Sequence, residues 1–286
     1  MHDFKDYTFL IPFKNDNIDR VINLNIILRY INNFFETSVC IVEQIDDHNH
    51  KTDINTLEFN NINIKHLVLN DKTNNERFSG IHKTKLYNIG ISNIETNNII
   101  CFDCDIIIPI NQMIISRDNM NNGCDYIFPF SQGYIEIIKS PDEYRKNLLN
   151  TYDFNKYNDY VFSRQKIVDS TPERKGVYKP PGLVRGNPPG GCVFIKKTVY
   201  VDIGMENENF YGYGPEDQER KYRLEKFNYN TKIIPGYLYH LEHNISHNRT
   251  SPIIYKKLFE NLKHFDINQL KLYYKELNYK QIYGII

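Results

Sequence analysis

Residues 99–109, with the sequence IICFDCDIIIP, place two aspartates one residue apart between two apolar runs. In an extended strand, residues two positions apart point to the same face, so we expect Asp103 and Asp105 to project together. Burying two like charges this close is costly unless a cation lies between them, and carboxylates favour Mg²⁺ or Mn²⁺, which also bind phosphate oxygens. The segment therefore predicts a strand end that presents a metal to a phosphorylated ligand. The alternative is a turn with two solvated aspartates.

The N-terminal part of the chain predicts a parallel α/β sheet. Residues 7–13 and 38–44 are apolar runs, and residues 19–35 between them carry apolar side chains at helical spacing. A strand, a helix and a strand in this order form a right-handed crossover between parallel strands. Because ligands of open α/β sheets bind outside the carboxyl ends of the strands, we expect residues 12–15, residues 43–44 and the aspartate pair to share one rim.

A lysine follows at the predicted start of another helix. Residues 66–69 predict a third strand, and residues 83–91 predict a helix that begins at Lys83. A lysine at a helix N-terminus is poorly placed for the helix dipole but well placed to bind an anion there. The alternative is a solvated basic helix end.

Residues 209–219, NFYGYGPEDQE, open a helix that we expect to continue through Leu224. Aromatic residues and glycines predict a tight turn, and Glu216 and Asp217 fall in the first helical turn. Acidic residues there are favoured by the helix dipole, so simple capping is one explanation. A carboxylate held against aromatic rings also suits a sugar ligand or a general base.

A histidine cluster follows a short predicted strand near residue 238. His240, His243 and His247 lie within eight residues of one another. One imidazole, the aspartate pair and a diphosphate would complete an octahedral Mn²⁺ site. A structural role is the alternative for each histidine.

The remaining segments carry weaker patterns. Residues 126–130 predict a strand, residues 142–162 are expected to be partly helical, and residues 251–286 carry apolar side chains at helical spacing. The Pro/Gly-rich loop at residues 179–191 is either a domain linker or a mobile active-site loop.

Composition excludes some classes of function. The 286 residues include 35 basic and 35 acidic side chains, and this balance argues against a general nucleic-acid binder. The five scattered cysteines predict buried thiols in a reducing compartment. The polar N-terminus does not resemble a signal peptide, and no apolar run approaches the roughly 18 residues of a membrane span. We therefore expect a soluble, cytoplasmic protein or a domain of a larger one.

Several of these motifs occur together in one order. That order resembles the GT-A nucleotide-sugar glycosyltransferases, specifically the beta-1,4-galactosyltransferase-like group and related bacterial chondroitin-polymerase domains, over residues 7–249. The segments are IPFKN at 11–15, VEQ at 42–44, KTKLYNIG at 83–90, FDCD at 102–105, GG at 190–191, GYGPED at 212–217 and the histidine cluster.

The resemblance implies a single-domain α/β fold with a Rossmann-like, mixed and mainly parallel sheet flanked by helices. The domain would span residues 1–250, with a nucleotide-binding half at 1–110 and an acceptor and catalytic half at 111–250. Residues 251–286 would be a C-terminal helical extension.

The resemblance also implies roles for particular residues. Pro12, Phe13, Lys14 and Glu43 would line a uridine pocket, Lys83 would face the diphosphate, and Gly191 would lie close to the sugars. Asp103, Asp105 and His243, which fits the metal position better than His240, would hold the metal, Mn²⁺ or Mg²⁺. Glu216 would bind sugar hydroxyls, and Asp217 would be the general base.

The implied activity is inverting, metal-dependent transfer of a hexose of the Gal, GalNAc or Glc type. The donor would be a UDP-sugar and the acceptor a hydroxyl of a saccharide or glycan. Tyr213 stands where the family usually has Trp, and Pro215 replaces a glycine, so the sugar specificity stays open. The alternatives are a retaining GT-A hexosyltransferase, a UDP-sugar hydrolase and a non-catalytic glycan-binding protein.

Overall fold

The computed structural model describes residues 1–46, 50–54, 59–70, 80–137, 143–170, 183–184, 189–212, 214–244 and 253–283. Its helices are α1 (Ile18–Phe34), α2 (Lys83–Asn93), α3 (Ile110–Asn121), α4 (Glu143–Thr151), α5 (Phe154–Ser170), α6 (Lys197–Asp202), α7 (Glu216–Lys226), α8 (Ile253–Lys263) and α9 (Ile267–Tyr283). Its strands are β1 (His2–Lys14), β2 (Phe35–Ile45), β3 (Ile62–Asn70), β4 (Asn98–Phe102), β5 (Ile106–Ile107), β6 (Tyr126–Phe128), β7 (Tyr134–Ile137), β8 (Leu183–Val184), β9 (Cys192–Lys196), β10 (Thr231–Ile233) and β11 (Leu238–Leu241). Tyr213, His247 and most of the Pro/Gly-rich loop lie outside the described residues.

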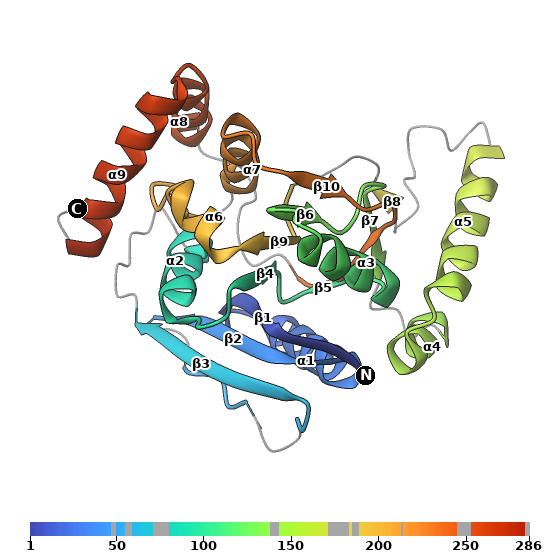
Figure 1. Ribbon diagram of the computed structural model, residues 1–286. Coiled ribbons are helices and arrows are strands. Elements are labelled where there is room, and N and C mark those ends of the chain that lie inside the picture. The colour runs from blue at the N-terminus through green and yellow to red at the C-terminus, as the bar shows by residue number, and fades with distance from the viewer. Residues whose placement is uncertain are drawn as a thin grey trace.

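A seven-stranded sheet in the order β10-β6-β9-β4-β1-β2-β3 forms the centre of the molecule (Figure 1). Its strands run parallel except for β9, which is antiparallel to both β4 and β6. The predicted mixed, mainly parallel sheet flanked by helices is thereby confirmed. Along the described part of the chain, no helix combines the length and the apolar character needed to cross a membrane.

Burial on both faces explains the continuous apolar sequence of the central strands. In β1, Phe9, Ile11 and Phe13 join the core cluster that contains the apolar side of α1. Leu10 points to the other face and packs in the cluster that contains α2, α6 and Leu224 of α7. A strand covered by helices on both faces cannot alternate polar with apolar residues, so its sequence is a near-unbroken apolar run.

A smaller sheet has the strand order β5-β11-β7-β8, and its strand β5 comes directly after β4 in the chain. Its strand β5 follows the aspartate pair directly, and β11 pairs with β5 in antiparallel register, with His240 opposite Ile106. The Leu241 N–H donates to the Asp105 carbonyl oxygen at 2.7 Å. This pairing brings the histidine-bearing strand next to the aspartate pair.

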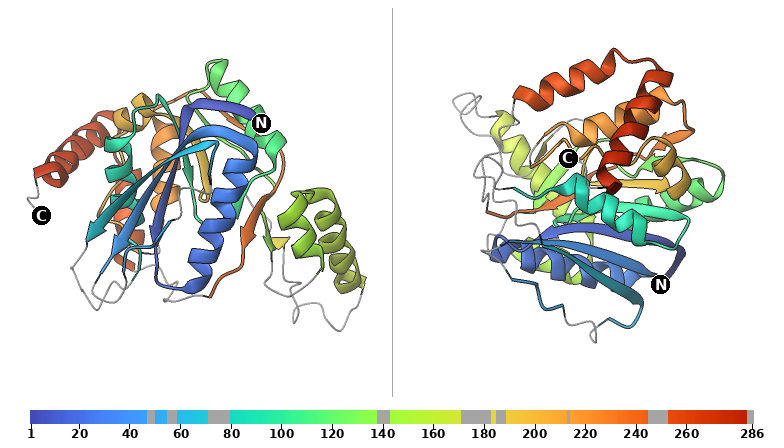
Figure 2. Two further views of the ribbon diagram at one scale, coloured as in Figure 1. Left: turned by 90° about the horizontal axis from the view of Figure 1, so that it is seen from below. Right: turned by 90° about the vertical axis from the view of Figure 1, so that its left-hand side faces the viewer.

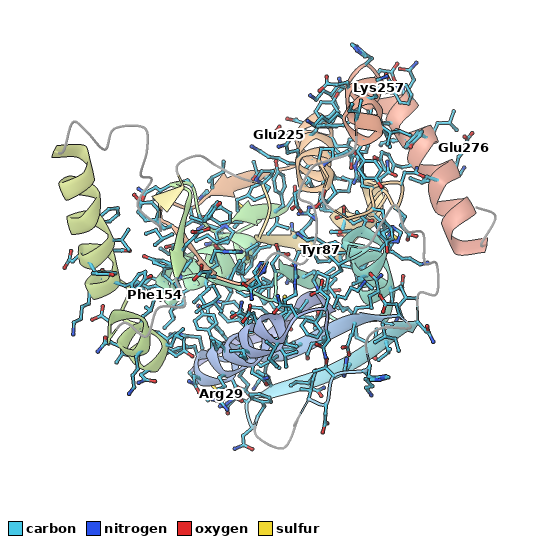
Figure 3. All side chains as sticks on the ribbon, turned by 180° about the vertical axis from the view of Figure 1, so that it is seen from behind. Arg29, Tyr87, Phe154, Glu225, Lys257 and Glu276 are labelled. Atoms are coloured by element: carbon cyan, nitrogen blue, oxygen red, sulfur yellow. The ribbon has the colours of Figure 1, made fainter. Side chains whose placement is uncertain are left out.

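Two helical pairs extend on opposite sides of the central sheet (Figures 1 and 2). The α4–α5 pair contacts the small sheet where Phe154, labelled in Figure 3, packs on Tyr239 with 4.4 Å between ring centroids. The α8–α9 pair packs against α7 through the cluster that includes Leu262, Leu270 and Tyr274. Both regions were predicted to be at least partly helical, while the division of the chain into functional halves stays a prediction.

Two details differ from or extend the predictions. The first helix ends at Phe34, and Phe35 begins β2 in extended conformation, with its ring fully buried against Phe4, Phe9 and Tyr30. All five cysteines are free and buried, which confirms the prediction of buried thiols.

The contact of α2 with β1 generates a stability prediction. Gly90 lies so close to Leu10 that an added Cβ would overlap the leucine side chain. We expect Gly90→Ala to destabilise the protein by about 1–3 kcal/mol through overpacking, which exceeds the gain of up to ~1 kcal/mol in helix propensity. Urea unfolding measures the change, and Ser92→Ala on the exposed end of the same helix should stay within about 0.5 kcal/mol.

A double variant tests the cause of this loss. Leu10→Ala opens space beneath position 90, so Leu10→Ala with Gly90→Ala should cost less than the sum of the two single changes. An additive double variant would mean that the two side chains do not compete for the same space.

Candidate active site

The aspartate pair lies in the turn between β4 and β5. Strand β4 ends at Phe102, and the Asp103 N–H donates to the Gly191 carbonyl oxygen at 2.9 Å. The prediction that both aspartates project from one strand face is therefore wrong, because neither residue belongs to a strand. Their carboxylates have different partners: Asp103 contacts Lys83, and Asp105 contacts His240 and His243.

The Asp105 cluster, formed by Asp105, His240 and His243, gathers one carboxylate and two imidazoles. The Asp105 Oδ2 atom lies 3.2 Å from His243 Nε2 and 3.8 Å from His240 Nε2. One ligand atom from each residue lies within 4.8 Å of the others. The His243 Nδ1 atom is 2.9 Å from the Asn244 carbonyl oxygen, a contact that orients the ring with Nε2 toward Asp105.

Helix α1 holds the segment that carries His243. The Asn244 N–H donates to Asp19 Oδ2 at 2.9 Å, and Asn17 Nδ2 donates to the Asn244 carbonyl oxygen at 3.2 Å. Further along the helix, Asn23 Nδ2 donates to the Leu241 carbonyl oxygen at 3.3 Å. The polar start of the first helix thereby fixes the end of β11.

The charges of the Asp105 cluster favour an ionised acid beside a protonated base. Burial alone would raise the pKa of Asp105, but His240, His243 and Arg20 outweigh burial and hold that pKa below its usual value. The hydrogen bond with Asp105 raises the pKa of His243, against the effect of burial. A metal ion bound here would compete with the proton of His243, because an imidazole must be neutral to bind a metal.

The donor set fits a divalent transition-metal ion. Imidazole nitrogen and carboxylate oxygen together suit Mn²⁺ better than Mg²⁺, which prefers oxygen ligands alone. His240, which the sequence ranked behind His243, lies in the same cluster. Asp103, also predicted as a metal ligand, instead contacts Lys83, and its role in metal binding stays a prediction.

The Lys83 cluster, formed by Lys83, Asp103 and Asp217, joins three distant segments of the chain. Lys83 Nζ lies 2.9 Å from Asp103 Oδ1 and 3.3 Å from Asp217 Oδ2. Lys83 Nζ lies over the ring of the buried Tyr87, 5.7 Å from its centroid, and Figure 3 labels Tyr87. The anion expected at the start of α2 is therefore supplied by two carboxylates of the protein itself.

Asp217 lies in the first turn of α7 between two cations. Its Oδ1 accepts from Arg220 Nη2 at 2.6 Å, while its Oδ2 faces Lys83. Burial raises the pKa of Asp217, but Lys83 and Arg220 outweigh it and hold the pKa below its usual value. A Cβ at Gly190 would lie 2.5 Å from Asp217 Oδ2, so only glycine allows this loop to approach the carboxylate so closely.

Glu216 provides a second, differently tuned carboxyl group. Its side chain is buried, and within the described residues its Oε2 atom has no hydrogen-bond partner. Burial first and the neighbouring charge of Asp217 second raise its pKa to about 8. Pro215 at the N-cap of α7 makes no side-chain hydrogen bond, and Glu216, Asp217 and Glu219 lie in the first helical turn, where the helix dipole favours acids.

The residues predicted to line a uridine pocket meet at the ends of β1 and β2. Phe13 pairs with Glu43 in the sheet and is fully buried. Lys14 forms an ion pair with Asp46 at 2.9 Å, and Glu43 accepts hydrogen bonds from Thr52 and lies 2.8 Å from His66 Nε2. Uridine binding by Pro12, Phe13, Lys14 and Glu43 stays a prediction.

Gly191, predicted to lie near the sugars, adopts a φ of +90°. A Cβ there would also approach Leu238 Cδ1 to 2.6 Å, so the position requires glycine for two reasons. Its carbonyl oxygen accepts from the Asp103 N–H, and the neighbouring Gly190 lies against Asp217, so the glycine pair adjoins the Lys83 cluster. A role of Gly191 in sugar binding stays a prediction.

Comparison with known proteins gives the fold a name. The chain matches a solved structure of S. aureus TarS 1-349 in complex with UDP-GlcNAc, with a TM-score of 0.52 and 13% identity over 96% of this chain and 70% of that chain. The chain has the GT-A fold. The catalytic domain of Drosophila beta1,4-galactosyltransferase 7 in complex with xylobiose aligns with a TM-score of 0.48 and 10% identity over 91% of this chain and 80% of that chain.

A mutant of the same Drosophila enzyme, solved with manganese, UDP-Gal and xylobiose, aligns with a TM-score of 0.41 and 10% identity over 88% of this chain and 69% of that chain. No protein-family model and no curated protein sequence matches the chain. At 13% identity the alignment with TarS supports the fold alone and leaves the chemistry of this chain to its own residues.

Metal binding to the Asp105 cluster can be measured directly. Because an imidazole must be neutral to bind a metal, Mn²⁺ binding should displace the proton of His243. The pKa of His243 is raised above 6.5, so Mn²⁺ affinity should increase as the pH rises above that value. Titration calorimetry in buffers of different ionisation enthalpy should detect proton release.

Two histidine variants provide the comparison. His243→Ala should weaken Mn²⁺ binding by about tenfold or more and reduce the proton release. The exposed His264 offers a control, and His264→Ala should bind like the wild type. Wild-type Mn²⁺ affinity in His243→Ala would contradict the assignment of this ligand.

Proposed function

We propose that the protein is a metal-dependent GT-A glycosyltransferase that transfers a hexose of the Gal, GalNAc or Glc type from a UDP-sugar to a saccharide hydroxyl with inversion. One observation carries the proposal. Lys83, Asp103 and Asp217 converge from three distant segments at the end of β4, next to the Asp105 cluster. A cation-binding group and a carboxylate base side by side match the two halves of such a transfer.

The donor half of the site would hold the leaving diphosphate. A divalent ion bound by Asp105, His240 and His243 would neutralise the phosphate charge that develops as the sugar leaves. Lys83 is the neighbouring protein cation, and its ammonium could exchange a carboxylate for a phosphate oxygen. Pro12, Phe13, Lys14 and Glu43 are the proposed contacts of the uridine.

The acceptor half would activate the attacking hydroxyl. The acceptor oxygen forms a bond to the anomeric carbon, the bond from that carbon to the phosphate oxygen breaks, and Asp217 Oδ2 takes the hydroxyl proton. In the free protein, Lys83 and Arg220 hold the pKa of Asp217 low. A diphosphate that attracts Lys83 would leave Asp217 with one cation fewer and make it a stronger base.

Glu216 fits a binding role better than the role of base. With a pKa of about 8, its carboxyl group is mostly protonated at neutral pH and cannot accept a further proton. A protonated carboxyl group both donates and accepts hydrogen bonds, which suits a sugar hydroxyl. Its unpartnered Oε2 supplies the needed acceptor.

Three other functions make different predictions. A retaining transferase would give an alpha-linked product from an alpha-linked donor, and a UDP-sugar hydrolase would consume donor equally well without a saccharide. A non-catalytic glycan-binding protein would bind saccharide without consuming donor. A panel of UDP-sugars with Mn²⁺, assayed with and without saccharide acceptors, separates these cases.

Asp217→Asn tests the base. The amide keeps the size of the carboxylate but cannot accept the hydroxyl proton, so transfer should fall by about 10²–10⁴-fold. Calorimetry should show donor affinity close to wild type, and the wild-type product should be beta-linked. Asp118→Asn, at an exposed position of α3, is the matched control. Unchanged transfer in Asp217→Asn would contradict the assignment.

Two changes at Glu216 separate binding from proton abstraction. Glutamine resembles a protonated carboxyl group, so Glu216→Gln should keep transfer at neutral pH within about tenfold of wild type. Glu216→Ala removes the hydrogen bonds and should cost about 10–100-fold, mainly in the KM of the acceptor. If Glu216→Gln loses as much transfer as Asp217→Asn, Glu216 is the base.

A further inference from the structure

Arg220 connects Asp217 to a buried acid on a different segment. Its side chain is only 3% exposed, and it lies one helical turn after Asp217 on α7. Arg220 Nη2 donates to Asp217 Oδ1 at 2.6 Å, and Nη1 donates to Glu206 Oε1 at 2.8 Å. The hydroxyl of Tyr200 also donates to Glu206 Oε1, so the acid is itself fixed in place.

We propose that Arg220 is a positioning residue for Asp217, which it holds through Oδ1 so that Oδ2 alone faces the reacting atoms. The role rests on the proposed function, in which Asp217 takes the acceptor proton. A carboxylate in a first helical turn can occupy more than one staggered rotamer, and hydrogen-bond partners select among them. Arg220 is such a partner, and Glu206 keeps the guanidinium from following the carboxylate.

A second buried arginine on the same helix shows what a purely structural pair looks like. Arg223 donates to both carboxylate oxygens of Glu219, at 2.7 and 2.9 Å. Its remaining donors go to carbonyl oxygens, and its guanidinium stacks 4.2 Å from the centroid of the Tyr274 ring on α9. Arg223 therefore helps to pack α7 against α9, and none of its contacts within the described residues is with Asp217.

Charge balance accounts for the presence of Arg220 but not for the geometry of its contacts. The carboxylates of Asp103, Asp217 and Glu206 share the two cations Lys83 and Arg220. Lys83 contacts Asp217 through Oδ2, whereas Arg220 donates to the other oxygen, Oδ1. Arg220 therefore restrains the oxygen that Lys83 does not contact.

The groups that face Asp217 come from three elements. Lys83 and Tyr87 approach from α2, Asp103 and Cys101 from the end of β4, and Glu216 and Arg220 from α7, with Glu206 behind Arg220. Lys83 and Arg220 are the cations in this set. If a diphosphate attracts Lys83, Arg220 is the cation that remains on Asp217.

The consequence for pH dependence has a definite sign. A cation within hydrogen-bond distance lowers a carboxyl pKa, so loss of Arg220 should raise the pKa of Asp217 by about one unit or more. Below that pKa the base is protonated and inactive. The acidic limb of the pH–rate profile should therefore move to higher pH, and kcat should fall because the carboxylate is no longer oriented.

The experiment compares three variants of the full chain. Arg220→Lys keeps the charge and loses the two-sided contact, while Arg220→Met with Glu206→Gln removes both charges and leaves no unpaired carboxylate. Arg223→Lys is the control for disturbing a buried arginine of the same helix. For each protein we would record the unfolding midpoint, Mn²⁺-dependent turnover of the best UDP-hexose against pH, and the carboxyl titration of Asp217 by NMR, assigned through Asp217→Asn.

The proposal expects a graded result. The double variant should lose at least about tenfold in kcat, with the donor KM within about twofold and both the Asp217 titration and the acidic limb shifted upward. Arg220→Lys should fall between the double variant and wild type. Arg223→Lys should lower the unfolding midpoint and leave the pH profile and the Asp217 titration as in wild type.

Two results would overturn the assignment in distinguishable ways. The first applies when the wild type turns over UDP-hexose. If the double variant then keeps the wild-type kcat and Asp217 titration, or if Arg223→Lys shifts that titration equally, the role of Arg220 alone is overturned. Absence of UDP-hexose turnover in the wild type overturns the proposed function and with it the role of Arg220.

Discussion

Carboxylates buried side by side need cations between them, and this requirement governs the centre of the molecule. Asp103, Asp217 and Glu206 come from a turn, a helix and a loop, and Lys83 and Arg220 lie between them. Glu206 is fully buried and Asp103 and Asp217 are partly buried, so a carboxylate left without a cation here would be destabilising. The end of β4, the start of α2 and the start of α7 meet at one point, and this meeting supplies the cations.

The two clusters share the turn between β4 and β5 but depend on different parts of the fold. The Lys83 cluster depends on the helices that cover one face of the central sheet. The Asp105 cluster depends on the small sheet, in which β11 pairs with β5, and on the polar start of α1. In the proposed transfer, Asp217 of the Lys83 cluster accepts the acceptor proton, and a metal ion bound by the Asp105 cluster would neutralise the charge of the leaving group.

The fold could be predicted well because the strongest sequence patterns, the long apolar runs, result from the burial of strands in the core. The apolar runs at residues 7–13 and 38–44 are strands covered on both faces, and Asp105 with His243 meet as expected. The prediction that Asp103 and Asp105 share a strand face was wrong because the three residues between β4 and β5 carry no periodicity that separates a turn from a strand. The spacing of Asp217 and Arg220 on one helix was readable, but no local pattern could reveal Glu206 as the distant partner.

If the proposed transfer holds, the distribution of charge has a consequence for how quickly an anionic donor would be captured. The chain carries equal numbers of basic and acidic side chains, and the cations of the site are already paired inside the protein. Such a molecule projects little electric field into solvent, so an anionic nucleotide would not be steered toward it from a distance. Its association rate should then be set by unassisted diffusion and respond only weakly to ionic strength, since paired interior charges are poorly screened by salt.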